Sequence, residues 1–127
     1  MDDTRGMLIF RAREVGGERA LPHGLSIGSV GAALLTSAGD IYTGICLDLA
    51  CGLGFCAEVA AIAEMLKSRQ TRIIAIVAVS KDGVIPPCGR CRETILQIDQ
   101  ENGDCRVILG ADREAPLRDL MPEHWLR

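Results

Sequence analysis

The sequence predicts an α/β protein in which helices pack on the faces of a mixed sheet, and three observations support this class. Of its 127 residues, 48% are hydrophobic but only 3% aromatic, so small aliphatic side chains must form the core of closely packed helices and strands. Segments with helical and with strand periodicity follow one another along the chain. The run "RIIAIVAVS" is almost wholly apolar, which is typical of a strand buried on both faces. The length fits one domain, residues 1–127.

The first half predicts a helix and then a β-hairpin. Apolar residues spaced through positions 7–15 favour a short helix that ends at the glycine pair 16–17. "PHG" at 22–24 is a predicted loop. The segments "SVGAALLT" and "IYTGICL", joined by the turn "SAGD", alternate as hairpin strands do.

The second half predicts alternating helices and strands. In order, these are a helix at 56–69, a strand at 72–80, a helix at 88–101, a strand at 105–110 and a short final helix with a tail in 115–127. Asn102 and Gly103 form the expected stop of the third helix. Two of these helices begin with cysteines, at points where loops meet the sheet.

Charge and composition exclude several classes of partner. The net charge is −3, with basic and acidic residues interspersed. Nucleic acid is therefore disfavoured as a partner, because its binding needs clustered cations, and a small neutral ligand fits better. No run approaches the ~20 apolar residues that span a bilayer, and no leader pattern opens the chain. We expect a soluble, cytoplasmic protein, in which six cysteines indicate a metal or catalysis before disulfides.

The stretch "VIPPCGRCRETIL" places Cys88 and Cys91 in the first turn of a helix. Residues three apart lie on one helix face, and the helix N-terminus favours the thiolate form. By themselves these thiols fit a redox dithiol, half of a structural zinc site or ligands of a catalytic metal.

The stretch "GFCAEVAAIAEML" favours the catalytic metal. Cys56 supplies a third ligand, and catalytic zinc takes three protein ligands and an open fourth position. Glu58 follows two residues later, about 200° around the helix, so it is free to handle protons beside the open position. A redox motif needs no third cysteine, and no fourth ligand for a structural site is evident. Cys46, Cys51 and Cys105 are interpreted as small hydrophobic residues.

The motifs "CAE" at 56–58 and "PCGRC" at 87–91 resemble the cytidine deaminase superfamily. The stretch "VGAALLTSAGDIYTG" at 30–44 is similar to its hairpin, and "LMP" followed by Trp125 resembles the tail of blasticidin S deaminases. The resemblance implies a three-layer α/β/α fold with a mixed five-stranded sheet, Zn²⁺ as cofactor and a homotetramer. It also implies hydrolytic deamination of a cytidine-type nucleoside or analogue, nearer to blasticidin S deaminases than to standard cytidine deaminases.

The resemblance also implies roles for individual residues. Cys56, Cys88 and Cys91 would bind zinc, and Glu58 would pass protons from water to the ring nitrogen and the leaving ammonia. The backbone N–H of Ala57 would hold the pyrimidine carbonyl.

Three further positions are expected near the reacting groups. The carbonyl of Pro86 would hold the substrate amine. Three thiolates leave a negative site, which a nearby cation should offset. Arg90 is the first candidate for that cation and Arg92 the second.

The substrate end departs from the family pattern. Cys46 and Asp48 stand where cytidine deaminases have an Asn and a Glu that hold the ribose, and Gly28 stands where an aromatic residue is frequent. Trp125 completes the predicted substrate-binding set, and could instead cover its own core or anchor a neighbouring subunit. These changes indicate a reshaped pocket. The alternatives are a deaminase of another amino-heterocycle or modified base, and a non-catalytic zinc-bound scaffold that binds a ligand.

Overall fold

A computed structural model describes residues 3–126. Its helices and strands are α1 (Thr4–Val15), β1 (Arg19–Ala20), β2 (Ser26–Thr36), β3 (Ile41–Asp48), α2 (Ala57–Lys67), β4 (Ile73–Ser80), β5 (Gly83–Ile85), α3 (Gly89–Ile98), the 3-10 helix η1 (Gln100–Asp104), β6 (Arg106–Ile108), β7 (Glu114–Pro116) and the 3-10 helix η2 (Leu117–Leu120). None of these helices is long and apolar enough to cross a membrane.

One mixed sheet of seven strands organises the fold. The long strand β2 pairs antiparallel with β3 along one edge and with β4 along the other. β4 continues the sheet through a parallel pairing with β6, which pairs antiparallel with β7. The short strand β1 pairs antiparallel with β2, and the short strand β5 pairs antiparallel with β4. The predicted fold class is confirmed, with seven strands rather than five.

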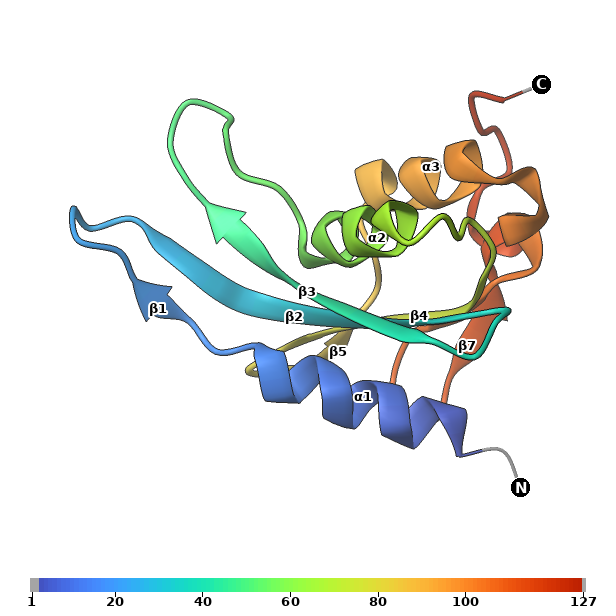
Figure 1. Cartoon of the computed structure of the whole chain (residues 1–127), viewed down its shortest axis with the longest axis horizontal. Coiled ribbons are helices and arrows are strands. Elements are labelled where there is room, and N and C mark those ends of the chain that lie inside the picture. Colours follow the sequence, from blue (N-terminus) through green and yellow to red (C-terminus); the bar gives the residue numbers. More distant parts are fainter. Residues whose placement is uncertain (1–2, 127) are drawn as a thin grey trace.

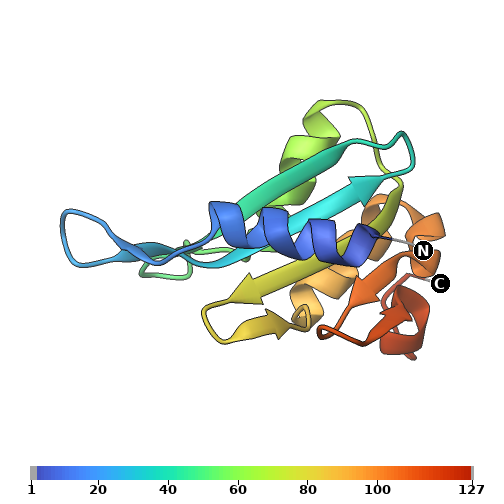
Figure 2. The same cartoon turned by 90° about the horizontal axis from the view of Figure 1, so that it is seen from below.

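Helices cover both faces of the sheet (Figures 1 and 2). α1 lies on one face, and α2 and α3 lie on the other. β3 and β4 both run antiparallel to β2, so they run parallel to each other and need a crossover connection, which α2 supplies. α3 likewise lies in the connection between the parallel strands β4 and β6. This connectivity brings α2 and α3 to the same face.

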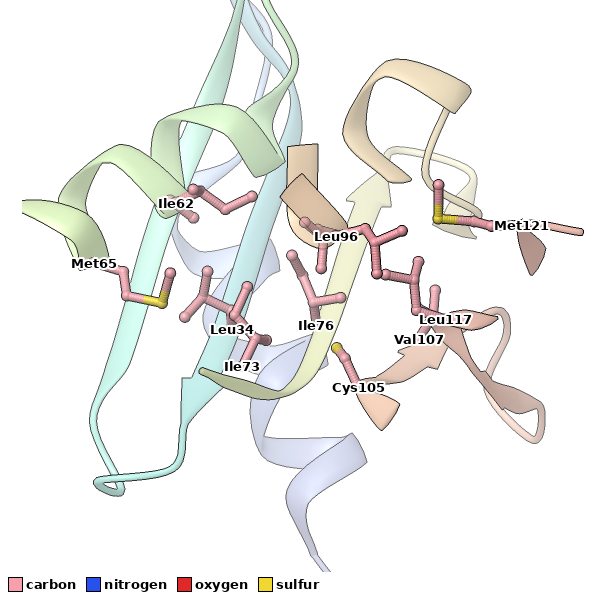
Figure 3. Packing of buried hydrophobic residues seen from close by; sticks show 12 residues of the cluster. Leu34, Ile62, Met65, Ile73, Ile76, Leu96, Cys105, Val107, Leu117 and Met121 are labelled. Carbon is pink, nitrogen blue, oxygen red and sulfur yellow. The ribbon is translucent and has the colours of Figure 1, made fainter. Parts of the chain in front are cut away.

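The larger core lies between the sheet and the layer of α2 and α3 (Figure 3). Its members include Leu34, Ile62, Met65, Ile73, Ile76, Ile95, Leu96, Val107 and Leu117. On the other face Leu8 and Ala12 of α1 pack on small strand residues such as Ala33 and Ala75. Aliphatic side chains of moderate size therefore fill both layers, as the low aromatic content predicts.

Two predicted helices end elsewhere than the pattern indicates. α3 stops at Ile98, because Asp99 takes an extended conformation (φ −168°, ψ 115°) and its side chain accepts a hydrogen bond from the Glu101 N–H in η1. The predicted final helix is reduced to the 3-10 turn η2, which starts after Pro116 and ends before Pro122. Both differences come from local capping and proline, which override the apolar spacing.

Candidate metal centre and catalytic pocket

The structure brings three cysteines together where two helices begin. Cys56 is the N-cap residue of α2 and Cys88 that of α3, while Cys91 lies in the first turn of α3. The Sγ atom of Cys88 lies 3.5 Å from that of Cys56 and 3.7 Å from that of Cys91. All three sulfur atoms lie within 4.8 Å of one another.

This spacing fits a zinc ion. Zinc binds thiolates at about 2.3 Å in tetrahedral geometry, which separates neighbouring sulfur atoms by about 3.8 Å. Three thiols leave one tetrahedral position for a non-protein ligand, as catalytic zinc sites do. Across residues 3–126 no other group of three cysteine, histidine or acidic side chains is arranged for a metal. Cys56, Cys88 and Cys91 are therefore the residues that could hold Zn²⁺.

The electrostatics of the three thiols also favour a bound cation. Burial opposes ionisation of Cys88, yet hydrogen bonds from the backbone N–H groups of Cys91 and Arg90 and from neighbouring thiols bring its pKa below the ordinary value. The pKa of Cys56 is raised by burial and by its contact with Cys88. Burial, and then the charge of Glu58, raise the pKa of Cys91. A metal cation would offset the repulsion among three thiolates.

Glu58 is the second residue of α2 and the one charged residue that is buried within residues 3–126, with 4% of its surface exposed. Burial raises its pKa, although its own backbone N–H and the Cys91 thiol partly oppose this rise. A carboxyl group whose pKa is raised toward neutrality can both take up and release a proton. Its position beside the thiols therefore suits proton transfer.

A pocket of about 360 Å³ opens over this centre. It is lined by Ser29, Val30, Cys46, Leu47, Asp48, Gly54, Phe55, Cys56, Ala57, Glu58, Ile85, Pro86, Cys88 and Arg90. The pocket thus joins the start of α2, the start of α3, the first half of β2 and the end of β3. Eight of the predicted site residues line it, and Cys91 is fully buried with its sulfur 3.7 Å from that of Cys88.

The two arginines beside the cysteines differ in what they contact. Arg90 is exposed and lines the pocket. The guanidinium of Arg92 instead donates from Nε to the Pro87 carbonyl at 2.9 Å and from Nη1 to the Leu120 carbonyl at 3.2 Å. Arg92 therefore links the loop before α3 to η2 through hydrogen bonds. Of the two arginines, Arg90 is the one that lines the pocket.

Two predicted substrate contacts lie outside the pocket. Trp125 is not among the lining residues; it has 72% of its surface exposed, and its backbone N–H donates to Glu93 Oε1 on α3. Gly28 is buried at φ +81°, and a Cβ there would lie 2.5 Å from the Gly17 carbonyl oxygen. Gly28 acts through backbone shape, because only glycine adopts this conformation freely.

The sequence did not predict the other six lining residues, which are Ser29, Val30, Leu47, Gly54, Phe55 and Ile85. Ser29 is the polar one among them, and its hydroxyl oxygen lies 3.0 Å from Asp48 Oδ2. No local signal marks it, since a serine at the start of the predicted strand belongs to no functional motif. The pairing of β2 with β3 is what places it beside Asp48.

The sequence of this chain matches a known protein family and several named relatives. Residues 18–108 match the family described as the cytidine and deoxycytidylate deaminase zinc-binding region. A cytidine deaminase of Mycobacterium tuberculosis is 34% identical over 98 residues, which cover 75% of this chain and 71% of that protein. A probable cytidine deaminase of Dictyostelium discoideum is 40% identical over 82 residues, 62% of this chain and 53% of that protein.

Crystal structures of cytidine deaminases resemble this chain over nearly its whole length. The crystal structure of the Mycobacterium tuberculosis cytidine deaminase superposes with a TM-score of 0.83 at 27% identity, covering 99% of this chain and 100% of that chain. The cytidine deaminase of Burkholderia pseudomallei superposes with a TM-score of 0.76 at 28% identity, covering 94% of this chain and 98% of that chain.

Proposed function

Because this chain belongs to the family of zinc-binding cytidine and deoxycytidylate deaminases, we propose that it hydrolyses the exocyclic C–N bond of a cytidine-type nucleoside or analogue. The observation that carries the proposal is the position of Glu58. Its buried carboxyl group lines the same pocket as Cys56 and Cys88, whose sulfur atoms lie 3.5 Å apart.

Zinc, when bound by the three cysteines, supplies a water molecule that loses a proton near neutral pH. Glu58 would take one water proton and pass it to the ring nitrogen while the water oxygen bonds to the ring carbon. Glu58 would then carry the proton of the resulting hydroxyl to the exocyclic amine, so that the C–N bond breaks, the ring carbon keeps the oxygen as a carbonyl and ammonia leaves. Burial prepares Glu58 for both steps, since a raised pKa makes the protonated form accessible.

Two backbone groups suit the pyrimidine ring. Ala57 is the first residue of α2, so its N–H has no partner within the helix and can donate to the ring carbonyl. Pro86 is exposed and lines the pocket, and its carbonyl can accept from the substrate amine. Both contacts use the main chain, so both are independent of the side chains at these positions.

The proposal extends to the assembly of the protein, to its cellular compartment and to the substrates on which it should be tested. Large apolar side chains are exposed on this chain, with Trp125 at 72%, Leu53 at 69% and Phe10 at 64%, and a homo-oligomer, a tetramer by family resemblance, would cover them. All six cysteines are free thiols, which fits a reducing cytoplasm. Blasticidin S stays on the panel because of the resemblance in the tail around Trp125.

The decisive experiment measures ammonia release by the purified, zinc-loaded protein. The panel contains cytidine, deoxycytidine, cytosine, blasticidin S and other aminated heterocycles. The control is Glu58→Gln with its zinc content measured. Turnover by the native chain that vanishes in the zinc-loaded control supports the proposal. Stoichiometric zinc without turnover on any substrate would contradict it and favour a non-catalytic binding scaffold.

A further inference from the structure

Two of the three clustered cysteines can be reached through the pocket, and the third cannot. Cys56 and Cys88 line the pocket, where Cys88 is exposed and Cys56 is partly buried. Cys91 is not among the lining residues and is fully buried. A small molecule that enters the pocket therefore meets the sulfur atoms of Cys56 and Cys88 first.

The same two sulfur atoms are close enough to be joined by a covalent bond. They lie 3.5 Å apart, whereas the sulfur atoms of Cys88 and Cys91 lie 3.7 Å apart. A disulfide bond joins two sulfur atoms at about 2.05 Å, so each sulfur needs to move by less than about 1 Å. Cys56 and Cys88 are both N-cap residues, which precede the regular part of their helices. A rotation of their side chains can therefore close the gap without unwinding α2 or α3.

Cys88 is the more accessible member of this pair and the one placed to react first. Its sulfur accepts hydrogen bonds from the backbone N–H groups of Arg90 and Cys91 at the start of α3. Such donors stabilise negative charge on sulfur, and a negatively charged sulfur is the form that attacks a peroxide. Cys56 is the neighbouring thiol in the pocket that can then react with the oxidised sulfur of Cys88.

We propose that Cys56 and Cys88 form an oxidative modification site, at which hydrogen peroxide converts these two candidate metal ligands into a disulfide bond. In the first step the Cys88 thiolate attacks one peroxide oxygen, the O–O bond breaks, hydroxide leaves and a sulfenic acid forms. In the second step the Cys56 thiolate attacks the Cys88 sulfur, the S–O bond breaks and a second hydroxide leaves. The two sulfur atoms together lose two electrons, and the peroxide gains them.

This disulfide exchanges one link between the two helices for another. It removes two of the three thiolates that could hold a zinc ion, and Cys91 alone is too few ligands to retain the metal. It also joins the start of α2 to the start of α3, the two segments that a bound ion would link. The oxidised protein therefore loses its metal but keeps its fold. The disulfide also protects Cys88 from irreversible oxidation to a sulfinic acid, so a thiol reductant reverses the change.

The test treats the native zinc-loaded protein with hydrogen peroxide. A chromophoric zinc indicator measures the release of the metal, and mass spectrometry of tryptic peptides identifies the sulfur atoms that become joined. Trypsin cleaves after Lys81 and after Arg90, so Cys88 and Cys91 fall in separate peptides. We expect a cross-link between Cys56 and Cys88 whose yield matches the zinc released, and dithiothreitol with added zinc should restore the metal content. A disulfide between Cys88 and Cys91, zinc release without a cross-link, or retention of zinc with free thiols overturns the proposal.

Two variants separate the roles of the thiols. Cys51→Ser is the matched control, because Cys51 is an exposed free thiol outside the pocket lining, and it should form the same cross-link in the same yield. Cys56→Ser removes the second thiol of the pair, so Cys88 should proceed to a sulfinic acid that dithiothreitol does not reduce. Reversible oxidation of Cys88 in Cys56→Ser would contradict the role given to Cys56.

A thermal measurement tests whether the disulfide links the helices. The oxidised protein should melt at a higher temperature than the reduced protein in chelator, because the cross-link constrains the unfolded chain. A lower melting temperature of the oxidised protein would contradict this link. None of these measurements depends on ammonia release. The modification can therefore fail while the deaminase assignment stands, and it can be confirmed on a chain that deaminates no substrate.

Discussion

The side-chain oxygen Oδ1 of Asn102 accepts a hydrogen bond from the backbone N–H of Ile73 at 2.8 Å. Asn102 is fully buried in η1, and Ile73 opens the central strand β4. The amide nitrogen of Asn102 donates to the carbonyls of Thr71 and Ile95 at 2.9 and 3.0 Å. One side chain thus joins the end of α3, η1 and the start of β4.

Replacement of Asn102 by Ala should lower the free energy of unfolding by about 2–4 kcal/mol, because one backbone N–H loses its side-chain acceptor and two carbonyls, one of them buried, lose a donor. Urea denaturation of the zinc-loaded protein measures this change. Gln100→Ala, at an exposed position of the same 3-10 helix, should stay within about 0.5 kcal/mol of the native chain. Equal stability of the two variants would show that the buried amide is dispensable.

Gly44 sets the distance between β3 and the helix that carries Cys56 and Glu58. A Cβ at position 44 would lie 2.5 Å from the Ala61 nitrogen and 2.6 Å from the Ala57 oxygen. Gly44→Ala should therefore push α2 from the sheet and cost about 1–3 kcal/mol of stability. Zinc retention during dialysis should fall as well, since the start of α2 moves relative to α3.

The matched glycine substitution is Gly6→Ala, where a Cβ meets nothing within 4 Å in an exposed turn of α1. It should raise stability by up to about 1 kcal/mol, because alanine favours a helix interior over glycine. A Gly44→Ala variant with native melting temperature and native zinc content would show that the helix can shift at no cost.

Removal of the metal should lower the melting temperature of the protein. The three sulfur ligands come from two helices, so a bound ion links the start of α2 to the start of α3, and ligand binding to the folded state raises stability. Differential scanning calorimetry with and without a chelator measures the shift. Cys56→Ser should show a smaller response, since one of its three thiolates is gone. An unchanged melting temperature of the native protein in chelator would be inconsistent with a metal that links the helices.

Arg92→Lys should destabilise the protein by about 1–3 kcal/mol, because an ammonium group cannot bond the Pro87 and Leu120 carbonyls in the geometry of the guanidinium fork. Arg90→Lys is the comparison, because Arg90 is exposed and its replacement should change stability by less than about 0.5 kcal/mol. Chemical denaturation of both variants checks the difference. If Arg90→Lys lowers the free energy of unfolding more than Arg92→Lys does, then Arg90 and not Arg92 has the structural role.

Burial raises the pKa of the Cys105 thiol to about 12, above its ordinary value of 9.0. The folded state then keeps a proton that the unfolded state loses, so this contribution to stability is present below pH 9 and is lost as the pH rises toward 12. The free energy of unfolding should fall more steeply across this window in the native chain than in Cys105→Ala. Parallel slopes for the two proteins would argue against a protonated, buried thiol.

Local patterns predicted the elements that carry the chemistry. The spacing of Cys88 and Cys91, and that of Cys56 and Glu58, needs only a helix start to place each pair, and helical periodicity marks both helices. The apolar run at 72–80 contains β4, which is buried along most of its length. These features depend on residues close in sequence, so one sequence suffices to read them.

Other features depend on partners far along the chain. The short strands β1, β5 and β7 span two or three residues, too few for an alternation to be read. The 3-10 helix η1 begins where the Asp99 side chain caps it. The bonds that hold Arg92 and Asn102 go to carbonyls and amides that no local pattern identifies.

By itself the sequence determined the fold class, the three candidate ligands and the candidate proton carrier, because helix and strand periodicity and motif spacing are local properties. Only the tertiary structure decided that Ser29 stands beside Asp48, that Gly28 shapes a bulge, and that Trp125 lies away from the pocket. The physical reason is strand pairing. A bulge between Ile27 and Gly31 changes the register against β3, and register is set by contacts between strands, which no single segment encodes.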